Sequence, residues 1–126
     1  MRKLKLPERE EEGPRLTDTD VRVIDEIGID GVKEHAREMV KDKLREQPEN
    51  DGYQTPRAGN PVYKAMHACN ASSRKELSRF HKIPAGGTMT ETEINAVVNL
   101  LTRWIVREYN FYQEEHREKQ KSLAEF

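Results

Sequence analysis

Signals that begin an α-helix recur five times along the chain, and each stands ahead of apolar residues at helical spacing. Capping side chains at a helix start accept hydrogen bonds from backbone amides that have no partner within the helix. No segment shows the alternation of apolar and polar residues that is typical of a strand. The sequence therefore predicts an all-α fold of about five helices around one core. The five signals are Thr17 with Asp20, Asp30, Asn60-Pro61, Ser73 with Glu76, and Thr90 with Glu93.

Glycine and proline residues predict where these helices end. Gly28 stands where a left-handed residue would close the first helix, and Pro48 follows the second. Turn-forming residues from 50 to 59 predict a loop, and residues 84–89 predict a glycine-bearing connector.

The apolar stripes predict which side chains form the core. We expect Leu77 and Phe80 to point inward from the helix that begins near Ser73. Cys69 lies on the apolar stripe of the preceding helix, which favours a small buried hydrophobe over a nucleophile. The last helix has the longest stripe, which we expect to comprise Ile94, Val97, Val98, Leu101, Trp104, Ile105 and Phe111. Helical spacing likewise favours a core role over base stacking for its aromatic residues Trp104, Tyr109, Phe111 and Tyr112.

The 126 residues suit a single domain, which we divide into three parts. Residues 1–15 have mixed charge, proline, glycine and no periodicity, so we predict a flexible charged arm. Residues 16–113 form the helical domain. Residues 114–126 are polar on all sides, so this tail either extends the last helix into solvent or frays.

Composition bears on where the protein works. No apolar run approaches the length that spans a membrane, and acidic residues follow the basic N-terminus where a signal peptide would have its apolar segment. Cys69 is the only cysteine, so no disulfide can form within the chain. We expect a cytoplasmic protein without a membrane partner.

Charge is distributed unevenly, although the formal net charge is only -1. Ten acids and six bases lie between residues 20 and 51, whereas residues 61–82 contain the single acid Glu76 against five bases. A basic helix pair could bind phosphates, and free amides at a helix start near Ser73 would add donors. The leading hypothesis is a nucleic-acid or ribonucleoprotein-binding module, and the alternative is an ordinary solvated face. The predicted anion-binding residues are Lys64, Arg74, Lys75, Arg79 and Lys82.

Three histidines support a second hypothesis. His35, His67 and His81 could bind a divalent metal ion or transfer protons near neutral pH if the fold brings them together. The protein would then be a metal-assisted hydrolase, with Arg74 holding an anion. Their spacing matches no metal motif, so structural roles without a cofactor stay open. A third alternative is a small subunit of an assembly that binds a protein partner.

A series of landmarks between Ile24 and Arg107 resembles an uncharacterised family of bacterial and archaeal proteins, known only as domain of unknown function 4186. The resemblance implies one domain over this range but no activity. The landmarks are His35-Ala36, Gln54-Thr55-Pro56, Gly59-Asn60-Pro61-Val62-Tyr63, His67-Ala68, Arg74, Leu77, His81 and Trp104-Ile105.

The chain departs from that family's pattern at four positions. The resemblance implies histidine in many members where this chain has Asn60, and cysteines where it has Ser72, Ser73 and Glu76. Such a Cys/His cluster has the character of a metal site. Serine is a poor zinc ligand beside thiolate, so we expect no intact cysteine-metal site here.

Overall fold

The structure, a computed structural model, describes the backbone of residues 3–124 and the side chains of residues 3–119. Within the described backbone there are four helices and no strand, which confirms the all-α prediction. The expected count of about five helices is one too high, because the chain bends at Gly28 within a single helix. The helices are α1 (Asp18–Leu44), α2 (Pro61–Ala68), α3 (Arg74–His81) and α4 (Glu91–Ala124).

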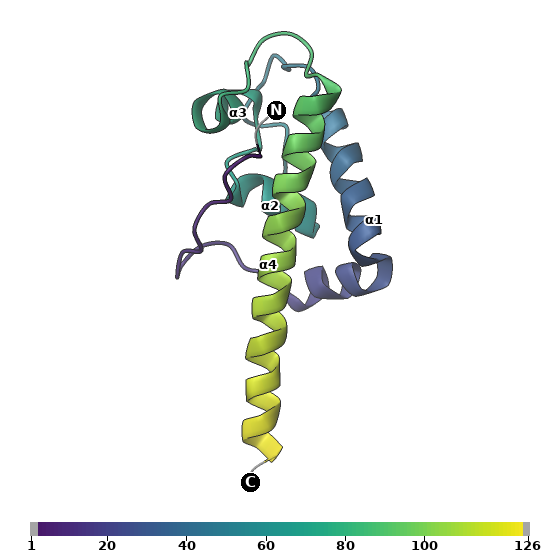
Figure 1. The fold of residues 1–126 in the computed structure, drawn as a ribbon, viewed down its shortest axis with the longest axis vertical. Coiled ribbons are helices and arrows are strands. Elements are labelled where there is room, and N and C mark those ends of the chain that lie inside the picture. Colours follow the sequence, from purple (N-terminus) through teal and green to yellow (C-terminus); the bar gives the residue numbers. More distant parts are fainter. Residues whose placement is uncertain (1–2, 125–126) are drawn as a thin grey trace.

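Gly28 changes the direction of α1 (Figure 1). Its φ of 71° lies in the region that favours glycine, as the predicted helix end requires, but its ψ of 175° is extended. A left-handed cap would have a ψ near 47°. The chain therefore resumes the helix on a new axis without an intervening loop.

Local capping fixes the other helix starts as predicted. Thr17 and Asp20 cap each other reciprocally at the start of α1, with nitrogen–oxygen distances of 2.9 and 3.2 Å. The Asn60 side chain accepts a hydrogen bond of 2.9 Å from the amide of Tyr63 in α2. Thr90 caps α4 in the same reciprocal way as Thr17.

The core lies where α1, α2 and α4 contact one another. Leu77 of α3 is fully buried as predicted, but Phe80 is 48% exposed and Phe111 is 43% exposed, so both expected core positions are wrong. The chain takes a left-handed conformation at Lys82, and the amide of Ile83 then donates to the carbonyl of Leu77 at 3.1 Å. This helix end directs Ile83 into the core in place of Phe80.

Residues 3–9 lie beside α4, whereas the sequence predicts a flexible arm (Figure 1). Leu4 is buried, and its carbonyl accepts a hydrogen bond of 2.6 Å from Arg103. One helical turn later, Arg107 donates to the carbonyl of Pro7 at 2.7 Å. The arm thus runs parallel to α4, held by arginines that bind its backbone.

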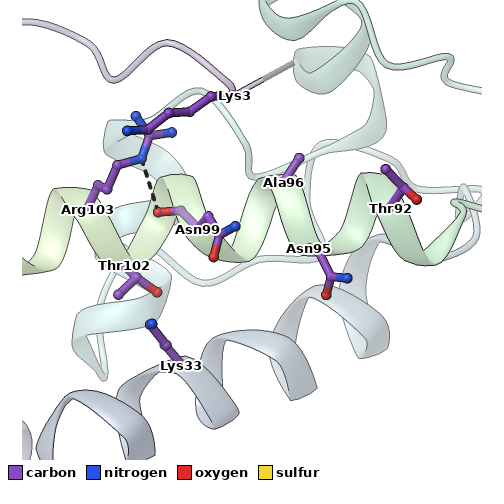
Figure 2. Close-up of a pocket in the computed structure, with 8 residues that line it drawn as sticks. All are labelled: Lys3, Lys33, Thr92, Asn95, Ala96, Asn99, Thr102 and Arg103. Atoms are coloured by element: carbon purple, nitrogen blue, oxygen red, sulfur yellow. Dashed lines mark hydrogen bonds between the residues drawn. The ribbon is translucent and has the colours of Figure 1, made fainter. Parts of the chain in front are cut away.

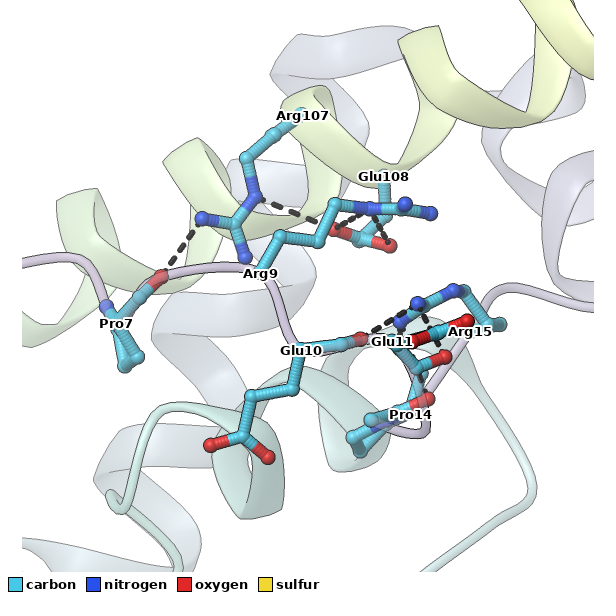
Figure 3. A network of polar contacts seen from close by, with 9 residues as sticks. Pro7, Arg9, Glu10, Glu11, Pro14, Arg15, Arg107 and Glu108 are labelled. Atoms are coloured by element: carbon cyan, nitrogen blue, oxygen red, sulfur yellow. Dashed lines mark hydrogen bonds and ion pairs between the residues drawn. The ribbon is translucent and has the colours of Figure 1, made fainter.

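A buried carboxylate anchors the middle of the arm (Figure 3). Glu108 pairs with Arg9 of the arm at 3.0 Å and with Arg107 at 3.2 Å. The two guanidinium groups offset the cost of burying this charge. Arg15 holds the following turn by donating to the carbonyls of Glu10, Glu11, Gly13 and Pro14.

The C-terminal part of α4 projects beyond the other helices (Figure 1). Before it leaves them, the hydroxyls of Tyr109 and Tyr112 donate to Asp25 and Asp18 in the first part of α1. Residues 114–124 remain helical, which is the first of the two outcomes expected for the tail; residues 125–126 lie outside the described backbone. None of the described helices is both long enough and apolar enough to cross a membrane.

Candidate nucleic-acid interface

Arg74 is not on the surface, although we predicted it to bind anions. Its side chain is 1% exposed, and its guanidinium donates to five backbone carbonyls at 2.8–3.2 Å. These contacts join the first turn of α3 to the end of α1 and to the glycine-bearing loop. Arg74 therefore has a structural role and is not available to phosphate. The acceptors are the carbonyls of Leu44, Arg45, Pro84, Gly86 and Gly87.

The free amides expected at the start of α3 are also occupied. The Asp51 carboxylate accepts hydrogen bonds from the amides of Arg74 and Lys75, both at 2.9 Å. Ser73 caps the helix as predicted by accepting from the amide of Glu76 at 3.0 Å. The Glu76 carboxylate does not cap Ser73 in return, as Asp20 caps Thr17, but accepts from the amide and the hydroxyl of Ser72. This helix start therefore holds a carboxylate of its own chain in place of a bound phosphate.

Hydrogen bonding keeps Asp51 ionised despite its burial. Desolvation raises its pKa, but the side chains of Gln54 and Gln47 and the amides of Arg74 and Lys75 donate to the carboxylate. Together these donors hold the pKa of Asp51 below its usual value.

Lys64 is not part of an exposed basic face either, because it pairs with an acid. Its ammonium group lies 2.5 Å from the carboxylate of Asp20, and only 16% of its side chain is exposed. The pair links α2 to the start of α1. Of the five predicted residues, Lys75, Arg79 and Lys82 alone remain exposed.

A groove of about 660 Å³ lies between the N-terminal arm and α3, and we call it the arm–α3 groove. Phe80 stands in it with nearly half of its surface exposed, and the guanidinium of Arg79 lies 5.2 Å from the centre of its ring. Three lysines line the same groove as this aromatic ring, and Glu8 is the only acid among the described residues of the lining. The groove is lined by Lys3, Leu4, Lys5, Pro7, Glu8, Asn70, Phe80, His81 and Lys82.

Lys3 and Lys5 were not among the predicted binding residues, because a charged arm without periodicity predicts no fixed structure. A signal was present: Leu4 and Leu6 alternate with the two lysines, as they would in an extended segment with one face on a core. Leu4 is buried and Leu6 packs against the core, whereas both lysines are exposed.

The three histidines do not form a metal site. His67 and His81 each bond through Nε2 to a backbone carbonyl, of Thr55 at 2.9 Å and of Cys69 at 2.8 Å. His35 lies half-buried on α1. Across the part of the chain that the structure describes, no three histidine, cysteine or acidic side chains are grouped to hold a metal ion. The convergence that the hydrolase hypothesis requires is therefore not found.

Cys69 is fully buried, in line with the interpretation as a small hydrophobe. Burial raises the pKa of its thiol to about 12, since a thiolate would have to exist without water around it. The thiol is therefore protonated at neutral pH and is a poor nucleophile.

Comparison with known proteins bears out the family resemblance. The chain matches the family described as a domain of unknown function (DUF4186) over residues 7–106, and it belongs to this family. The match starts within the arm and ends within α4, so it includes all of α1, α2 and α3. No solved structure matches the chain.

Proposed function

We propose that this member of the DUF4186 family binds single-stranded nucleic acid in the arm–α3 groove. The observation that carries the proposal is the exposed ring of Phe80 among Lys3, Lys5 and Lys82. Proteins that bind single strands combine a basic groove for the backbone with aromatic rings on which bases stack. Both parts of that combination meet here.

The neighbouring charges extend the basic surface beyond the groove. Lys75 and Arg79 are one helical turn apart on the exposed side of α3, and Lys82 follows at its end. Their ammonium and guanidinium groups would meet successive phosphates, while Phe80 offers its ring to a base. A duplex keeps its base faces stacked inside, so this aromatic contact favours a single strand.

The backbone conformation of Lys82 supports a role for its side chain. Its φ of 60° is uncommon for a residue with a Cβ, and glycine is the usual residue at such a helix end. A strained conformation that persists is a reason to suspect function. A lysine here keeps a positive charge on the groove at some cost in stability.

We place this binding in the cytoplasm, with RNA in a ribonucleoprotein as one target and single-stranded DNA as the other. The single cysteine is free, and a chain without a disulfide suits a reducing compartment. Stacking and phosphate contacts are open to RNA and to single-stranded DNA alike, so both nucleic acids belong in the test.

Fluorescence anisotropy with labelled oligothymidine and oligouridine of about 20 nucleotides tests the proposal, since single-strand sites span about 4–16 nucleotides. Joint replacement of Lys75, Arg79 and Lys82 by alanine should weaken binding at least about tenfold and lower the salt slope by about 2. Arg74 is left intact because its loss would unfold the start of α3. An affinity that changes neither with salt concentration nor in this triple variant would contradict the proposal.

A matched pair of phenylalanines tests the stacking contact. Phe80→Leu should weaken binding about tenfold, because stacking on an aromatic ring contributes about 1–3 kcal/mol per base. Phe111 is exposed to a similar extent, and the guanidinium carbon of Arg9 lies 3.8 Å from the centre of its ring. Phe111 does not line the groove. Phe111→Leu should leave the affinity unchanged. Equal effects of the two substitutions would argue against the groove.

A further inference from the structure

A second hollow of about 560 Å³ lies between the arm, α1 and α4, and we call it the α4 pocket (Figure 2). Lys3 lines both this pocket and the arm–α3 groove, so the two hollows are neighbours that share one residue of the N-terminal arm. The α4 pocket is lined by Lys3, Lys33, Thr92, Asn95, Ala96, Asn99, Thr102 and Arg103.

All charged side chains among the described residues that line the α4 pocket are positive. Lys33 comes from α1, Arg103 from α4 and Lys3 from the arm, and no described residue of the lining has a carboxylate. Arg103 is held in place because it donates to the carbonyls of Leu4 and Asn99. A fixed guanidinium in a pocket that is also lined by two lysines is suited to a phosphate group.

Two asparagines add hydrogen-bonding groups beside these charges. Asn95 and Asn99 are four residues apart and so share one side of α4 (Figure 2). The side-chain oxygen of Asn95 accepts from Arg37, which leaves its amide hydrogens as donors. A side-chain amide can donate to and accept from the edge of a base, whereas a lysine contacts phosphate without regard to sequence.

We propose that a single strand bound in the arm–α3 groove crosses the arm at Lys3 and continues into the α4 pocket. There Lys33 and Arg103 would hold a phosphate, and Asn95 and Asn99 would contact the edge of a base. This inference rests on the proposed function and deepens it. The arm–α3 groove stacks any base, and the α4 pocket gives the protein a preference among bases.

The test compares strands of two lengths in competition with a labelled strand of about 20 nucleotides. A strand of about 4 nucleotides fills the groove alone, and one of about 12 also reaches the α4 pocket. Lys33→Ala should weaken binding of the longer strand about threefold to tenfold and leave the shorter strand unchanged. Lys119→Ala, at an exposed lysine on the projecting end of α4, should change neither.

A second measurement concerns base preference. Homopolymer strands of the four bases should differ in affinity for the wild-type protein, and Asn99→Ala should reduce those differences more than it reduces mean affinity. Lys33 and Asn99 are both exposed, so the thermal unfolding midpoint should not move. If Lys33→Ala bound the longer strand as tightly as the wild type, the proposed role of the α4 pocket would be wrong, and the proposed binding in the arm–α3 groove would be unaffected. Failure of every strand to bind the wild-type protein would overturn both proposals.

Discussion

The carboxylate of Asp51 accepts a hydrogen bond of 2.9 Å from the backbone amide of Arg74. Asp51 lies in the long loop between α1 and α2, and Arg74 opens α3. A negative charge at a helix start is stabilised by the free amides and by the helix dipole. The loop and α3 are therefore joined at this contact, and the guanidinium of Arg74 continues the connection to the end of α1.

Replacement of Asp51 by alanine should lower the free energy of unfolding by about 2–4 kcal/mol, because hydrogen bonds to charged groups contribute about 1.5–3 kcal/mol each. Urea unfolding at pH 7 measures this loss. Glu49→Ala, at an exposed acid of the same loop, is the control and should change stability by less than about 0.5 kcal/mol. Similar losses in the two variants would show that Asp51 does not anchor α3.

Stability should fall in acid partly through Asp51. Its pKa is lowered in the folded protein, so the unfolded chain, with a pKa near 3.9, takes up the proton first as the pH drops. The contribution of Asp51 is therefore complete well above pH 3.9 and is lost as the pH falls through the folded pKa. Asp51→Asn cannot titrate, so the stability difference between wild type and this variant should shrink between about pH 5 and pH 3. A difference that stays constant or grows would contradict this sign.

Arg74→Lys should destabilise the protein by about 3 kcal/mol or more, although the charge is kept. A lysine ammonium has three donors on a flexible stem and cannot reach five carbonyls that surround a planar guanidinium. Each carbonyl left buried without a partner costs about 1–3 kcal/mol. Lys75→Ala, at the exposed neighbour, should change stability by less than about 0.5 kcal/mol. Chemical unfolding of both variants checks the contrast, and a stable Arg74→Lys protein would contradict the structural role.

The features that the sequence predicted correctly are local ones. Thr17, Asn60 and Thr90 cap helices with partners three residues away, so their roles can be read from a short segment. Leu77 is buried as predicted, because the cap at Ser73 fixes where α3 begins and so which residues of the helix face the core. Such signals predict that helices exist and where they begin.

The features that the sequence did not predict depend on distant segments. Counting charges placed Arg74 on a surface, but its acceptors lie 10–30 residues away in the chain and surround it only after folding. The arm binds α4 through arginines about 100 residues later, so its own composition gives little warning. Phe80 has helical spacing from Leu77, yet the left-handed turn at Lys82 gives the core position to Ile83. The candidate site in the structure therefore differs from the predicted one: it is the groove beside the arm and not the start of α3.

Lys82→Gly should stabilise the fold and weaken strand binding at the same time. Glycine adopts the φ of 60° at this helix end without strain, so the free energy of unfolding should rise by about 0.5–1 kcal/mol. The substitution also removes a positive charge from the arm–α3 groove, so binding should weaken about threefold to tenfold at low salt.

Lys82→Ala separates the two effects, because it removes the same charge but keeps a Cβ in the left-handed conformation. It should weaken binding as Lys82→Gly does, without the gain in stability. Thermal unfolding of the two variants measures the change in stability, and fluorescence anisotropy measures the change in affinity. If Lys82→Gly gained stability and bound oligothymidine and oligouridine as tightly as the wild type, the lysine would have no binding role to explain its strained backbone, and the groove would lose one of its three cations.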